Sequence, residues 1–182
     1  MTDYKALTKY LVDLGIEEVP HTGKSYLAHL VAVYRFMEAD GCDAELCGAG
    51  MFHSIYGTQQ FQGFRLELDR REALREMLGK RAERLAYLNC AMDRAAFDEA
   101  LTSGSCRYRD RITGEETTLS RADFDDLCRV HLYDWLEQVP RSRLGWGYRR
   151  DAYRAMARRS GPVAEAAYAR VFGQEPQAAA AP

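Results

Sequence analysis

The segment from Tyr26 to Ala39 limits the possible folds of this chain more than any other segment. Its apolar residues recur three and four positions apart, which predicts a helix, and together they cover much of the helix circumference. A helix that is apolar on so many sides must be covered by several neighbours, so we expect it at the centre of a helical protein. The apolar positions are Tyr26, Leu27, Leu30, Val31, Val33, Tyr34 and Met37.

Helical patterns with recognisable start and stop signals fill most of the remaining chain. Thr22 or Gly23 is the expected start of the central helix, and the stretch 106–119 alternates polar and apolar residues, which predicts a small β-hairpin. We therefore expect an all-α fold, a compact single-domain helical bundle over 1–173, followed by a disordered tail at 174–182. The other expected helices lie at about 3–14, 43–55, 69–78, 93–101, 120–139, 148–159 and 162–172, and a further short helix after Gly79 carries Ala82, Leu85, Ala86 and Leu88 as its apolar stripe.

The overall composition is that of a globular protein with balanced charge. The 182 residues fit one domain with a substantial core, and 25 Lys+Arg stand against 27 Asp+Glu, which gives no reason to expect a nucleic-acid partner. No segment approaches the roughly 18 apolar residues of a membrane span, and the N-terminus lacks the pattern of a signal peptide. We expect a cytoplasmic protein that acts on a small molecule, with no membrane partner.

Two further residue classes bear on the chemistry. Five scattered cysteines without a CxxC pair predict neither a disulfide framework nor a thiolate zinc site, so we expect them to be reduced. A cationic stretch in the C-terminal third fits a solvated face, with a clamp for phosphate or carboxylate as the alternative. Its members are Arg141, Arg143, Arg149 and Arg150.

The chain contains only four histidines, and two of them are expected to meet. His29 lies near the start of the central helix, and His53 lies at the end of the next predicted helix, with the Asp40-Gly41 turn between them. Helices joined by so short a turn pack antiparallel, which brings these two histidines to the same end of the pair. His131 and Asp134 are three residues apart on a later helix, so they share a face and are expected to point to a common place.

The stretch YLAHLVAVYRFMEADGCDAELCGAGMFHSIYG, from Tyr26 to Gly57, resembles the first two core helices of the HD superfamily of metal-dependent phosphohydrolases and oxygenases. There, a helical histidine is followed one helix later by a His-Asp pair and a glycine. The resemblance implies that His29 and His53 are metal ligands and that Asp134, in the string HLYDWLE, is the last ligand.

This sequence departs from the pattern of that superfamily at two points. Ser54 stands where the superfamily has the aspartate of the His-Asp pair, and no histidine occurs between Ser54 and Val130. A hydroxyl is a much poorer ligand than a carboxylate. We therefore expect one divalent metal ion (Fe, Mn, Zn or Ni) held by His29, His53 and Asp134, with a site that holds no metal as the alternative.

The remaining candidate residues surround these ligands in the sequence. His131 and His21 are the expected proton-transfer groups, and Tyr56 is a third candidate for catalysis because it follows His53 closely. Residues in and after the His53 string are expected to contact the substrate: Ser54, Thr58, Gln59 and Arg65.

Three functions are consistent with this set of residues. The first is a metal-dependent hydrolase acting on a small polar or anionic substrate, in which the ion polarises the scissile group and activates water. The second is an iron-dependent oxygenase, which the resemblance also allows. The third is a metal-free protein of HD-like fold that binds a ligand or performs acid/base chemistry.

Overall fold

The computed structural model describes residues 3–176 of the chain. In this range it contains helices and two short antiparallel strand pairs, so the predicted all-α fold is confirmed. Of the predicted tail, 177–182 lies outside the described residues, while the Gln174 N–H donates to the Val171 carbonyl oxygen at the end of the last helix. The α-helices are α1 (Tyr4–Asp13), α2 (Tyr26–Ala39), α3 (Ala44–Met51), α4 (Arg71–Leu78), α5 (Lys80–Ala91), α6 (Arg94–Ser103), α7 (Arg121–Gln138), α8 (Arg150–Ser160) and α9 (Pro162–Phe172).

Two hairpins and three 3-10 helices complete the described fold. The hairpin predicted at 106–119 is confirmed, with β3 (Arg107–Arg109) paired to β4 (Glu116–Thr118). A second hairpin was not predicted, because its strands are only two residues long and carry no periodicity. It pairs β1 (Pro20–His21) with β2 (Lys24–Ser25). The 3-10 helices are η1 (Ile16–Glu18), η2 (Leu68–Arg70) and η3 (Val139–Arg141).

This second hairpin corrects the expected start of α2. Thr22 and Gly23 both have positive φ angles, 36° and 77°, and form the tight turn between the two strands. The residue that caps α2 is therefore Ser25, whose Oγ atom accepts a hydrogen bond from the Ala28 N–H at 3.2 Å.

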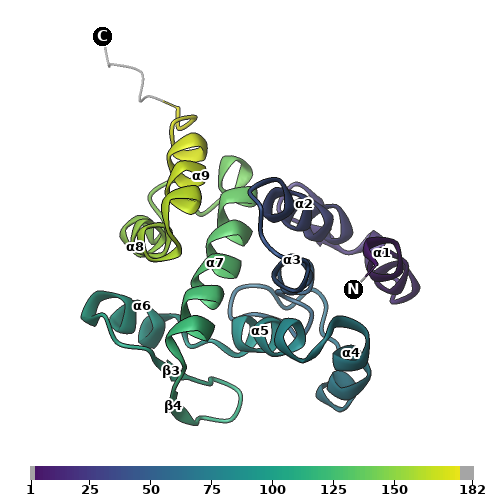
Figure 1. Cartoon of the computed structure of the whole chain (residues 1–182). Helices are drawn as coiled ribbons and strands as arrows, with labels where there is room; N and C mark the ends of the chain where they lie inside the picture. The colour runs from purple at the N-terminus through teal and green to yellow at the C-terminus, as the bar shows by residue number, and fades with distance from the viewer. Residues whose placement is uncertain (1–2, 177–182) are drawn as a thin grey trace.

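Helix α7 occupies the centre of the bundle (Figure 1). It packs against α2, α3 and α5 on one side and against α8 and α9 on the other. Every residue from 130 to 136 is buried, so this part of the helix is covered around its whole circumference. The sequence pattern pointed to α2 as the central helix, because the polar residues His131 and Asp134 interrupt the apolar pattern of α7.

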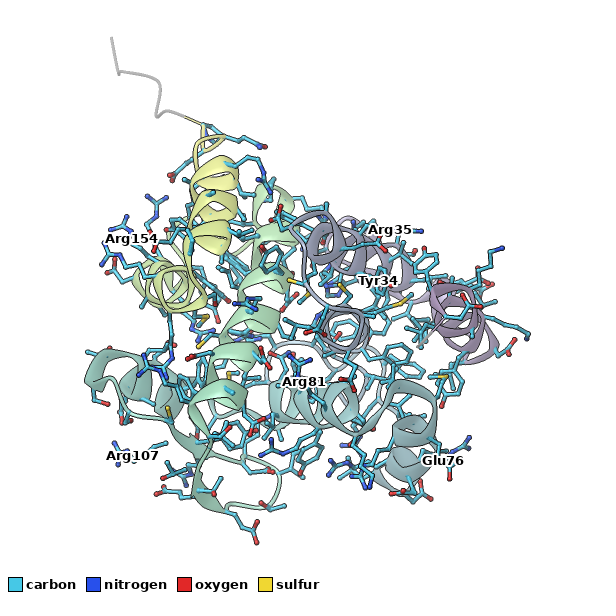
Figure 2. All side chains as sticks on the ribbon, viewed as in Figure 1. Tyr34, Arg35, Glu76, Arg81, Arg107 and Arg154 are labelled. Carbon is cyan, nitrogen blue, oxygen red and sulfur yellow. The ribbon has the colours of Figure 1, made fainter. Side chains whose placement is uncertain are left out.

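Several charged side chains lie at the periphery of this bundle. Figure 2 shows the interior between the helices filled with side chains, whereas the labelled Glu76, Arg107 and Arg154 lie at the rim and are exposed. All five cysteines are free, as expected. Within residues 3–176, no helix combines the length and the apolar composition that a membrane crossing requires.

Small residues allow α2 and α3 to approach closely. Gly48, Ala49 and Gly50 are all buried in α3. A Cβ atom at Gly50 would overlap the Sδ atom of Met37 and lie 3.4 Å from Val33 Cγ1, whereas one at Gly48 would meet only ordinary contacts at 3.7 Å or more. The two glycines therefore have different roles, although they are only two residues apart.

We expect opposite effects from substitutions at these two glycines. Gly48→Ala should raise the free energy of unfolding by about 0.5–1 kcal/mol, because alanine favours the helix and its methyl group meets only ordinary van der Waals contacts. Gly50→Val should lower it by about 1–3 kcal/mol, because the added carbons push α2 away from α3. Urea unfolding of both variants measures the difference, and equal stabilities would contradict the proposed close contact.

Candidate metal centre

Side chains from three elements meet in the interior, beside α7. His29 lies in the first turns of α2, His53 follows α3, and Asp134 lies in α7. The Nε2 atoms of His29 and His53 are 3.3 Å apart, and the Asp134 Oδ1 atom is 3.2 Å from each of them. All three residues are buried, and they form a group that could hold a metal ion. The predicted meeting of the two histidines is thus confirmed.

His53 reaches this position from a turn rather than from a helix. Helix α3 ends at Met51, whereas the sequence predicted a helix to Ile55. The chain then turns, with the Ile55 N–H donating to the Phe52 carbonyl oxygen at 3.0 Å. Gly57, with a φ of 74°, completes the change of direction. The residues from Phe52 to Ile55 were expected to be helical but form a turn, and this turn carries the predicted metal ligand His53.

The spacing of the three atoms fits coordination of a single ion. With metal–ligand bonds of about 2.1 Å, two ligand atoms lie about 3.0 Å apart at an octahedral angle and about 3.4 Å apart at a tetrahedral angle. The observed separations of 3.2–3.3 Å fall between these two values. Two imidazole nitrogens and a carboxylate oxygen suit zinc, iron, manganese or nickel.

Hydrogen bonds to the other ring nitrogens orient both imidazoles. The His29 Nδ1–H donates to Glu137 Oε2 at 2.5 Å, and the His53 Nδ1–H donates to the Gly50 carbonyl oxygen at 2.7 Å. Each Nε2 atom in this tautomer presents its lone pair to the centre of the group. Histidine ligands of metal ions commonly have such a carboxylate or carbonyl partner, which fixes the ring and increases its basicity.

The charge distribution at the centre also calls for a cation. Asp134 is buried, and its contacts are the two imidazoles and the Gln138 amide, which donates to Oδ1 at 2.8 Å. Burial alone would raise the pKa of Asp134, but its contacts with His53 and His29 hold that pKa well below its usual value. The carboxylate is therefore ionised and needs a positive charge between itself and the imidazoles, either a proton or a metal ion.

Glu137 also contacts the candidate centre, although it was not among the residues predicted from the sequence. Besides His29, its carboxylate pairs with Arg141, at 2.5 Å, and with Lys24. Burial would raise the pKa of Glu137, but the hydrogen bonds from His29 and Arg141 lower it to about 2. A signal was present, since Glu137 follows Asp134 by three residues and shares its helix face.

His21 lies at the edge of the centre. The β1–β2 hairpin places its ring 4.3 Å from the ring of His29, measured between centroids. Its Nε2 atom is buried and has no hydrogen-bond partner among the described residues. Burial, together with the nearby His29, lowers the pKa of His21 to about 4. His21 is therefore neutral at physiological pH and holds an unused polar atom beside the predicted ligands.

A cavity of about 540 Å³ opens next to this centre. His21, His53 and Asp134 line it, and so do two of the predicted substrate contacts, Ser54 and Thr58. Both hydroxyls already have protein partners: Ser54 Oγ lies 2.9 Å from the Tyr26 hydroxyl, and Thr58 Oγ1 accepts from the Phe61 N–H at 3.0 Å. The volume is in the range typical of small-molecule sites.

Three other predicted site residues lie outside the cavity lining. The Tyr56 hydroxyl donates to Glu83 Oε1 at 3.0 Å in the core, because this residue belongs to the turn that leads away from His53. Gln59 is exposed and accepts from the Arg94 backbone N–H at 3.1 Å. Arg65 is exposed beside Glu67. The roles predicted for Tyr56, Gln59 and Arg65 at the site are therefore corrected.

His131 is buried close by but does not join the ligand group. Its Nδ1–H donates to Asn89 Oδ1 at 3.0 Å, and its Nε2 atom accepts from the Arg149 guanidinium at 2.8 Å. The expectation that His131 and Asp134 point to a common place is wrong. A spacing of three residues leaves an angle of about 60° around the helix, and partners from α5 and the start of α8 occupy both ring nitrogens of His131.

One comparison with known proteins gives a match. A family model described as a domain of unknown function (DUF6817) matches residues 10–94. This stretch includes His21, His29 and His53 but ends before α7, so it contains neither Asp134 nor Glu137. No curated protein and no solved structure matches the chain.

The buried state of His131 predicts how stability depends on pH. Burial, reinforced by Arg149, holds the pKa of His131 well below its usual value. Unfolded histidine takes up a proton below about pH 6.5 while folded His131 stays neutral, so stability falls as the pH drops through this range. When the pH is lowered from about 7 to about 5.5, the free energy of unfolding of the metal-free wild type should fall by about 1 kcal/mol more than that of His131→Gln. Urea unfolding at both pH values measures this difference. Parallel pH dependences of the two proteins would contradict this assignment.

Glu137 should act on metal affinity through His29. The charge of Glu137 orients His29 and increases the basicity of its ring. Glu137→Gln removes this charge, and such changes weaken metal binding about 10–100-fold. We expect this loss in a titration of the metal-free protein with Zn²⁺. Glu175→Gln is the matched control, because Glu175 pairs with Arg150 outside the centre. Equal affinities of the two variants would argue against this role.

Proposed function

We propose that this protein is a metal-dependent hydrolase of HD-like fold, with His29, His53 and Asp134 holding one divalent ion. The observation that carries the proposal is the nearly equilateral group formed by their three ligand atoms, with separations of 3.2–3.3 Å. Both imidazoles present Nε2 to its centre, and Asp134 has no lysine or arginine partner among the described residues. The resemblance to the HD superfamily adds support, because it assigned ligand roles to the same residues from the sequence alone.

The surrounding residues have defined tasks in this proposal. A divalent ion supplies Lewis acidity, which polarises an ester or phosphoryl oxygen and lowers the pKa of water. Glu137 keeps His29 in the tautomer that can act as a ligand. His21 lines the cavity with an unpartnered Nε2 atom, which is positioned to accept a proton from water or to return one to a leaving group.

The proposed site holds one ion rather than two. Two-ion members of the HD superfamily use the carboxylate of the His-Asp pair as a shared ligand, and Ser54 stands at that position here. The Ser54 hydroxyl is within hydrogen-bond distance of the Tyr26 hydroxyl. Its place is thus that of a wall residue of the cavity.

A second candidate function is an iron-dependent oxygenase. Two histidines and one carboxylate on one face of an ion are also the ligands of ferrous iron in many non-haem oxygenases. A third candidate follows from the charge argument, since a proton shared by His29 and Asp134 would satisfy the same group. In that case the protein would bind a ligand or act by acid/base chemistry without metal.

Metal analysis distinguishes these functions. Protein purified without chelators should contain close to one divalent ion per chain, and His53→Ala should lose it. His131→Gln is the matched control, because it removes a buried histidine outside the ligand group, and it should keep the ion. Hydrolysis of ester and phosphoester substrates would support the leading proposal, whereas iron with substrate-dependent oxygen uptake would support the second. Metal content far below one ion per chain, unchanged by reconstitution, would exclude both.

A further inference from the structure

Two residues that line the cavity each carry a buried polar atom without a hydrogen-bond partner in the described part of the chain. One is His21 Nε2, which belongs to the proposed metal centre, and the other is Trp135 Nε1. Both residues line the cavity. Trp135 is 2% exposed, and a buried indole N–H usually finds an acceptor. A molecule bound in the cavity would supply the acceptor that the protein does not provide.

The Trp135 ring is held rigidly. It stacks on Tyr153 with the ring centroids 5.1 Å apart and an angle of 8° between the planes, and it packs against Tyr148 at 5.2 Å. Both tyrosines also line the cavity, together with Phe61. The cavity therefore has an aromatic wall, which favours a flat apolar group in whatever binds there.

Two cavity arginines have no ion-pair partner within residues 3–176. Arg94 is half-buried, and its guanidinium donates only to the neutral Tyr148 hydroxyl, at 3.2 Å. Arg143, in the loop after η3, forms no ion pair and is exposed. The other two arginines near the centre have carboxylate partners: Arg141 pairs with Glu137, and Arg149 pairs with Asp98. Arg94 and Arg143 are thus the cavity arginines whose charge no carboxylate of the described residues balances.

We propose that the cavity binds an organic oxyanion with an aromatic or similarly flat apolar body. The acidic group pairs with Arg94, assisted by Arg143, and an acceptor oxygen of the ligand takes the Trp135 N–H. A guanidinium binds carboxylate and phosphate alike through paired N–H donors, so the oxyanion is the chemistry that the two ligand types share. This inference names the substrate class of the proposed enzyme and in that sense rests on the proposed function.

The experiment compares four small probes by isothermal titration: phenyl phosphate, phenylacetate, benzyl alcohol and inorganic phosphate. We expect at least one aromatic anion to bind tenfold or more tightly than benzyl alcohol, which lacks the charge. The same anion should bind tighter than inorganic phosphate, which lacks the ring. The better of the two aromatic anions identifies the acidic group. Benzyl alcohol binding as tightly as both anions would overturn the proposal, and so would inorganic phosphate binding as tightly as phenyl phosphate.

Variants test the residues themselves. Arg94→Gln should weaken binding of the aromatic anion at least tenfold. Arg158→Gln is the matched control and should not change this binding, because Arg158 is exposed, lies outside the cavity and has no ion pair among the described residues. Trp135→Phe keeps a stacking ring but removes the N–H donor, and it should weaken binding of the aromatic anion several-fold. Thermal melting shows whether each variant is folded. Equal affinities of Arg94→Gln and Arg158→Gln would refute the assignment.

The same titrations after removal of metal keep this inference separate from the proposed hydrolase. Binding that depends on Arg94 should persist, although more weakly, in chelator-treated protein, because Arg94 and Trp135 do not need the ion. If the protein proved to hold no metal, binding of the anion through Arg94 would still be expected. Binding that disappears with the metal and is insensitive to Arg94→Gln would instead overturn the anion site while leaving the metal centre intact.

Discussion

The interaction on which the rest of the structure depends is the contact of the buried Asp134 carboxylate with two imidazoles. A carboxylate in an apolar interior stays ionised only with a positive charge or several donors nearby. Asp134 has one amide donor, from Gln138, and faces the Nε2 atoms of His29 and His53. The junction of α2, α3 and α7 is therefore incomplete without a cation. An ion bound there would stabilise the fold, because the unfolded chain has no preformed site.

A chain of hydrogen bonds explains why α7 carries a buried histidine that is not a ligand. Asp98 pairs with Arg149, Arg149 donates to His131, and His131 donates to Asn89. The Asn89 amide then donates to the backbone carbonyl oxygen of His53 at 2.8 Å. The Arg149 guanidinium can only donate, so His131 Nε2 is the acceptor and the ring proton lies on Nδ1. The backbone carbonyl of His53 is thus linked to α5, α7 and Arg149, and Cys90 Sγ donates to the same oxygen at 3.2 Å, so His53 keeps a donor even without His131.

The sequence predicts the helices and the pair of histidines well, because both depend on local patterns. Helical spacing and a tight turn were enough to bring His29 and His53 together. What it could not predict are contacts that depend on side-chain direction across helices. Glu137 and His131 each lie three residues from Asp134, yet Glu137 binds His29 and His131 turns to Asn89. The family resemblance identified Asp134 as a candidate ligand. The contact of Glu137 with His29 depends on the packing of α2 against α7, which the sequence does not show.

The balance of charge at the centre accounts for Ser54 and for the cavity arginines together. A carboxylate at Ser54 would add a second negative charge beside Asp134, where the structure offers no further buried cation. With serine, a bound divalent ion would exceed the charge of Asp134 by one, and the charges of Lys24 and Arg141 together exceed that of Glu137 by one. Like charges held in a cavity of low dielectric repel, and an anion relieves that repulsion. If the centre holds a divalent ion, the serine at position 54 and the proposed preference for an anionic ligand would both follow from the same electrostatic constraint.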